Sequence, residues 1–124
     1  MIRLTVKGQN IRSIIDEIKT QEKTKYLQNW EVQGNIDQIS ILIMESYSFR
    51  VNSDLTISVI FEFKNSSLEE EVFVTILASG GGQGLCGIGW GIHSSREREV
   101  LRRIEEVAKT KEWTIIVEEE TEGR

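Results

Sequence analysis

Apolar and polar residues alternate from Leu55 to Lys64, and this pattern limits the fold more than any other feature of the chain. Leucine, isoleucine, valine and two phenylalanines occupy every second position from 55 to 63, and most positions between them are polar. Successive side chains of a strand point to opposite faces of its sheet, so this period of two predicts a strand with one buried face. Weaker versions of the pattern predict further strands at residues 2–7, 26–32, 36–51, 70–79 and 113–117.

Two other segments carry the helical period of about 3.6 residues. Ile11, Ile14, Ile15 and Ile18 form one apolar stripe, which predicts a helix that ends near Lys23. Isoleucine is not a strong helix former, so this helix depends on burying its stripe against other elements. A second stripe predicts another amphipathic helix and comprises Val100, Leu101, Ile104, Val107 and Ala108.

The predicted elements follow the order β-α-β-β-β(-β)-α-β. We therefore predict an α+β fold, in which an antiparallel sheet of five to six strands has both amphipathic helices packed on one face. The 124 residues contain no linker or internal repeat, so residues 1–124 are predicted to form a single domain. This order resembles the strand–helix–four-strand–helix plan of TATA-box-binding-protein-like and helix-grip folds, a likeness of topology that carries no function.

The segment 36–51 has apolar residues at both odd and even positions. The odd positions dominate, with Ile39, Ile41 and Ile43 among them, so we expect this set to face the core. Apolar residues then remain on the second face of several strands, and they include Leu42, Met44, Ile60, Phe73 and Leu77. An exposed apolar patch of this kind usually marks an interface.

The composition argues against several classes of protein. A net charge of −5 and a pI near 5.0 disfavour nucleic-acid binding, which relies on basic groups that neutralise phosphates. No apolar run reaches the roughly 18 residues that cross a membrane, and the N-terminal segment lacks a signal-peptide pattern. The single cysteine can form neither an internal disulfide nor a multi-cysteine zinc site. We expect a cytoplasmic protein without membrane association, bound metal or other cofactor.

Seven of the ten glycines lie within residues 80–91, which makes this segment the candidate functional region. Ordered glycine costs conformational entropy, so the cluster indicates unusual backbone angles or a close approach by another group. The string from Gly82 to Gly87 matches G-x-G-x-x-G, but it lacks the βαβ unit of a dinucleotide site and the lysine of a phosphate-binding loop. Catalysis by Cys86 and His93 is disfavoured, because an extended backbone points them to opposite faces.

Glycine alternates with larger residues at 87–92, which predicts an extended strand with one face bare of side chains. Two interpretations stay open. A bent strand could pack against a helix for purely structural reasons, or the bare face could seat a ligand or a partner chain. The glycines before it predict a loop.

A capping-box pattern at Ser94 and Glu97 predicts the start of the second helix. Glycines ahead of a helix N-terminus also suit an anion, which His93 and Arg96 could help to hold, although Glu97 already places a negative charge there. The candidate ligand-binding or interface residues are Gly82, Gly84, Gly87, Gly89, Trp90, Gly91, His93, Ser94, Ser95 and Arg96.

Two functions of different classes are consistent with these observations. The favoured one is a non-catalytic cytosolic module that acts through homo-oligomeric or protein-partner association and uses the glycine-rich segment. The alternative is a small-molecule binding protein, with the ligand between sheet and helix under the glycine-rich loop 80–91. An enzyme ranks third, because no acid–base pair or activated nucleophile is recognisable and no catalytic residue is predicted.

Overall fold

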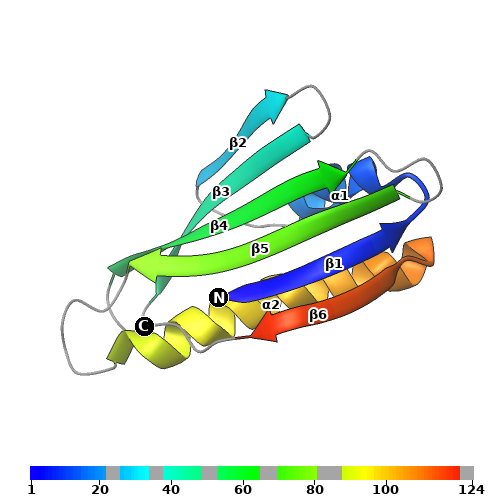
Figure 1. Cartoon of the computed structure of the whole chain (residues 1–124). Helices are drawn as coiled ribbons and strands as arrows, with labels where there is room; N and C mark the ends of the chain where they lie inside the picture. The colour runs from blue at the N-terminus through cyan, green and yellow to red at the C-terminus, as the bar shows by residue number, and fades with distance from the viewer. Residues whose placement is uncertain (22–25, 34–37, 49–52, 65–69, 81–87, 121–124) are drawn as a thin grey trace.

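One antiparallel sheet carries two α-helices on the same side in the computed structural model of the chain (Figure 1). The structure describes residues 1–21, 26–33, 38–48, 53–64, 70–80 and 88–120. The predicted combination of an antiparallel sheet with two α-helices, a mixed α+β fold, is confirmed. The elements are β1 (Ile2–Gly8), the 3-10 helix η1 (Ile11–Ser13), α1 (Ile14–Gln21), β2 (Tyr26–Gln33), β3 (Gln38–Ser48), β4 (Ser53–Lys64), β5 (Glu70–Gly80), α2 (Ile88–Lys111) and β6 (Thr114–Glu120).

The first strand lies inside the sheet rather than at its edge. Across the described ranges, six strands form one sheet in the order β2-β3-β4-β5-β1-β6. All neighbouring strands are antiparallel. Strands β2 to β5 follow one another as a meander, whereas β1 is inserted between β5 and β6. The sheet is open, with β2 and β6 as its edge strands.

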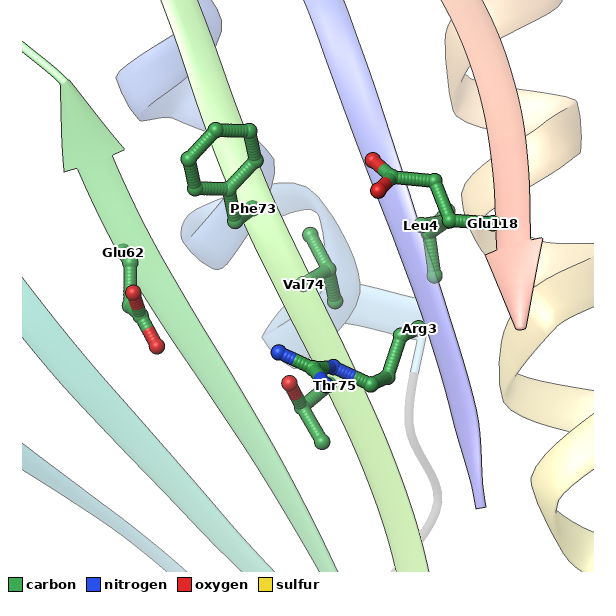
Figure 2. A pocket seen from close by; sticks show the side chains of 7 residues that line it. All are labelled: Arg3, Leu4, Glu62, Phe73, Val74, Thr75 and Glu118. Carbon is green, nitrogen blue, oxygen red and sulfur yellow. The ribbon is translucent and has the colours of Figure 1, made fainter. Parts of the chain in front are cut away.

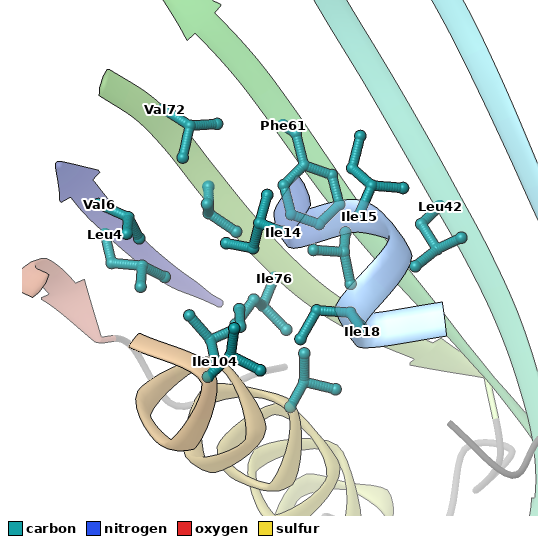
Figure 3. Packing of buried hydrophobic residues seen from close by; sticks show 14 of the residues in the cluster. Leu4, Val6, Ile14, Ile15, Ile18, Leu42, Phe61, Val72, Ile76 and Ile104 are labelled. Atoms are coloured by element: carbon teal, nitrogen blue, oxygen red, sulfur yellow. The ribbon is translucent and has the colours of Figure 1, made fainter. Parts of the chain in front are cut away.

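The hydrophobic core lies between the helices and one face of the sheet (Figure 3). Phe61 and Phe63 of β4 stack there with ring centroids 6.3 Å apart, and both are almost fully buried. The stripe predicted for the first helix is confirmed, because all four of its isoleucines are buried. Four of the five residues predicted for the second stripe are buried as well, namely Val100, Ile104, Val107 and Ala108.

The orientation predicted for β3 is wrong. Leu42 and Met44 are fully buried in the core, whereas Ile39 is 38% exposed on the other face. The pairing with β4 decides this orientation, because Leu42 lies opposite Val59 and Met44 lies opposite Ile57. Cross-strand partners share a face, so β3 turns the same way as the more strongly apolar side of β4.

A tight turn after α2 returns the chain to the sheet. Glu112 adopts a left-handed backbone with φ 61°, and the Trp113 N–H donates to the Ala108 carbonyl at 2.8 Å, which satisfies an otherwise unpaired carbonyl of the last helical turn. The Trp113 indole then donates to the Gln9 carbonyl at 2.8 Å. A Cβ at Gly8 would lie 2.2 Å from Trp113 Cδ1, so only glycine allows this close approach.

Candidate functional site

The glycine-rich segment is partly helical. Helix α2 begins at Ile88, so the extended strand predicted at residues 87–92 is wrong from residue 88 onward. The same spacing is consistent with a strand and with a helix, because positions four residues apart share a face in a strand and are neighbours on the surface of a helix. Period-two alternation over so few residues does not separate a strand from a helix.

The residues predicted from the sequence to form the site are distributed as follows. Gly82, Gly84 and Gly87 lie outside the described residues. Gly89, Trp90, Gly91, His93 and Ser94 follow one another along the first part of α2. Ser95 is exposed, and Arg96 is half-buried with its guanidinium paired to Glu99. Their role in binding stays a prediction.

The predicted capping box is wrong, because Glu97 lies more than two turns inside α2. Its carboxylate is buried and accepts hydrogen bonds from the Ala78 N–H and from the Met1 amino group, each at 2.9 Å. Buried carboxylates need such partners, since an uncompensated charge in the core is costly. Glu97 therefore links α2 to β5 and to the start of β1 rather than capping a helix.

The sheet face opposite the helices is not covered by any described element, and we call it the uncovered face (Figure 1). Six apolar side chains on β3, β4 and β5 form what we call the apolar patch of this face. Among them, Leu77 is 42% exposed and Ile39 is 38% exposed, and the others are half-buried. The apolar patch comprises Ile39, Ile41, Ile43, Ile60, Phe73 and Leu77.

The strand register makes the apolar patch continuous. Ile41 lies directly opposite Ile60, in the central row of the patch. On one side, Ile43, Ser58 and Leu77 form the next row across the three strands. On the other side, Ile39, Glu62 and Phe73 form the third row. Neighbouring rows on one face are two residues apart along each strand, so Ile60 lies diagonally next to both Leu77 and Phe73. The polar residues Ser58, Thr75 and Glu62 lie among these apolar positions.

Charged groups flank the apolar patch on β1, β4, β5 and β6, and the basic ones discussed here have acidic or aromatic partners. Lys7 lies 3.9 Å from Glu71, and Arg3 lies 3.8 Å from Glu119. The Lys64 ammonium lies 5.5 Å from the centre of the Phe73 ring. This flank therefore does not present a field of one sign that would select a strongly charged ligand.

A shallow pocket of about 160 Å³ opens on the uncovered face beside the apolar patch (Figure 2). The Phe73 ring lies between the carboxylates of Glu62 and Glu118, and the Arg3 side chain extends toward Thr75. The buried Thr5 hydroxyl donates to the Glu118 carboxylate. The pocket is mixed in character, with one aromatic ring, two acidic groups and one basic group.

The described residues hold neither a metal-ligating cluster nor a membrane-spanning helix. Within these ranges, no group of three or more His, Cys, Asp or Glu side chains is placed to hold a metal ion. The helices as described are too short or too polar to cross a membrane. Figure 3 shows apolar side chains of the sheet and of both helices pointing into the space between them.

Comparison of the chain with protein-family models, curated proteins and solved structures finds no match in any of the three. The sequence predicts the site at residues 82–96, whereas the apolar patch lies on the uncovered face of the sheet. The signal for it was present, because apolar residues occur on both faces of β3 and β5.

Proposed function

We propose that this chain is a non-catalytic α+β module that acts through association, and that its working surface is the uncovered face of the sheet. One observation carries the proposal. The apolar patch joins three neighbouring strands, and Ile39 and Leu77 within it are each more than one-third exposed. Contiguous apolar surface of this kind is uncommon on soluble monomers and typically marks an interaction site.

The energetics favour a protein partner for this surface. Removing an apolar side chain from water stabilises a complex by roughly 25 cal/mol per Å² of buried area. Six clustered side chains can therefore supply the centre of an interface, while the charged flank supplies a polar rim. The pocket beside Phe73 is small and shallow compared with typical ligand sites of roughly 300–1,000 Å³.

A matched pair of lysine substitutions tests the proposal. Leu77 and Val117 are both 42% exposed on strands, but Leu77 lies in the apolar patch. Val117 pairs with the buried Leu4 and so lies on the helix side. We expect Leu77→Lys to weaken association by at least tenfold, because it places a charge within the apolar patch, and Val117→Lys to leave it unchanged.

Size-exclusion chromatography with light scattering would measure the mass of each variant, and circular dichroism would confirm that both fold. The chain mass is 14.2 kDa, so a stable assembly appears at a multiple of that value or as a complex with a co-purified protein. Equal association of the two variants would contradict the proposal, as would an unmodified chain that remains alone.

A further inference from the structure

We infer that the uncovered face binds a second copy of this chain, packed face to face about a two-fold axis that crosses the strands at the row of Ile41 and Ile60. This inference rests on the proposed function and names its partner. In the resulting dimer the two sheets lie inside and the helices lie outside, which gives four layers.

The size of the face suits another sheet better than a peptide or a small molecule. Strands are spaced by about 4.8 Å and rise about 3.3 Å per residue, so six strands of about six residues span roughly 600 Å² in projection. Stable interfaces bury about 800 Å² of accessible surface per partner, and side chains make the accessible area larger than the projected one. The area of one whole face is therefore close to the area that each partner buries in a stable dimer.

The charges of the face favour a partner with the same mixture of groups. Lys7, Arg3 and Lys64 already engage Glu71, Glu119 and the Phe73 ring. An acidic ligand such as nucleic acid would have to displace these partners, and the chain as a whole carries a net charge of −5. A second copy brings the same mixture of basic and acidic groups, and a two-fold interface joins the same surface on both chains.

The pairing of β3, β4 and β5 favours a two-fold axis that runs perpendicular to the strands. Rotation about the central row exchanges the two flanking rows, so Ile43 meets Ile39 of the second copy and Leu77 meets its Phe73. Ser58 then meets Glu62, and its hydroxyl can donate to that carboxylate. Both apolar contacts and a hydrogen-bonding contact result from the same rotation.

An axis parallel to the strands through the middle of the sheet, between β4 and β5, gives a poorer match. It would place the isoleucines of β3 over β1, whose side chains on this face include Arg3 and Lys7. Burying those charges against apolar groups carries a desolvation cost that nothing repays. The perpendicular axis brings Arg3 opposite its own copy, but two strands away from Ile60 and with Glu119 beside it.

Cysteine cross-linking tests this arrangement. Cys86 is the only native cysteine, so Cys86→Ser provides a background without thiols. Facing sheets lie about 10 Å apart, which a short bismaleimide can bridge. In that background we expect Ile60→Cys to give a covalent dimer in high yield, because residue 60 lies on the axis. Thr110→Cys, an exposed position on α2, should give little.

A mixed experiment tests the exchange of the flanking rows. A chain with Leu77→Cys should cross-link to a chain with Phe73→Cys several-fold more efficiently than either cross-links to itself. Affinity tags of different size on the two chains separate the mixed product on a gel, and circular dichroism checks that each variant folds.

The outcomes separate the inference from the proposed function. A dimer that is sensitive to Leu77→Lys but cross-links poorly at residue 60 overturns the axis and leaves the proposed function standing. A complex with a different protein through the same face overturns the second copy as partner. Efficient cross-linking at residue 60 together with preferential Leu77–Phe73 cross-linking supports the whole arrangement.

Discussion

Ile60 and Phe61 are neighbours in β4, yet their side chains lie on the two faces of the sheet and meet different surroundings. Phe61 is fully buried under the helices, whereas Ile60 is half-buried in the apolar patch. The apolar side chains of the covered face are buried by helices of the same chain. The uncovered face holds apolar side chains of similar kind without an element of the chain over them in the described structure. One face is therefore covered by the chain itself, and the other is the face for which we propose a partner.

The largest expected effect is a difference in stability between alanine substitutions at these two neighbouring residues. Phe61→Ala removes a fully buried ring and should lower the free energy of unfolding by about 3–5 kcal/mol. Ile60→Ala should cost less than about 1 kcal/mol when the chain is measured below its association concentration, because its side chain is only half-buried. Urea unfolding followed by circular dichroism measures both. Equal losses would contradict the distinction between the faces.

The next effect compares one carboxylate on each side of the sheet. Glu97 is buried and accepts two hydrogen bonds, so Glu97→Gln should lower the free energy of unfolding by about 1–3 kcal/mol. Glu118 is exposed on the uncovered side and accepts from Thr5. Glu118→Gln should change stability by less than about 0.5 kcal/mol. Thermal unfolding measures both variants. A larger loss of stability for Glu118→Gln than for Glu97→Gln would contradict the view that the buried link from α2 to β5 contributes more to stability.

The smallest effect concerns the charged flank. Lys7 and Glu71 lie 3.9 Å apart, and both are partly exposed to solvent. Exposed ion pairs contribute about 0–1 kcal/mol, so Lys7→Gln should leave folding and association within about 0.5 kcal/mol of the unmodified chain. Urea unfolding and light scattering would check this. A large loss of association would show that the flank, rather than the apolar patch, supplies the binding energy.

Much of the fold was predictable, because local periodicity follows from burial. The alternation in β4 and the isoleucine stripe before and along α1 each contain one dominant apolar side, and these sides are buried. The elements for which the sequence reasoning was correct are those with a single strong pattern. For these elements, the spacing of apolar residues along the sequence was sufficient to predict which side is buried.

The orientation of β3 and the role of Glu97 depend on contacts that are distant in sequence. Leu42 and Met44 compete with three isoleucines on the other side of the strand, and pairing with β4 decides which set is buried. Glu97 matches a local capping pattern, but its partner Ala78 is 19 residues away. The start of α2 was missed because four-residue spacing suits a helix as well as a strand.

The candidate site was predictable only in part. The sequence showed more apolar residues than one sheet face can bury, and the apolar patch explains part of that excess. Which residues form the patch depended on the orientation of β3, so Ile39, Ile41 and Ile43 could not be assigned to it beforehand. The glycine-rich segment is unusual in its composition, which the sequence shows directly. The apolar patch has an ordinary composition and is recognisable only from the position of its residues in the folded sheet.

The most direct test of the central claim is the dependence of urea unfolding on protein concentration. Association of folded chains stabilises them by mass action, so the unfolding midpoint should rise as the concentration is increased a hundredfold. The midpoint of Leu77→Lys should stay constant over the same range. A midpoint of the unmodified chain that does not depend on concentration would contradict the claim that the uncovered face binds a second copy.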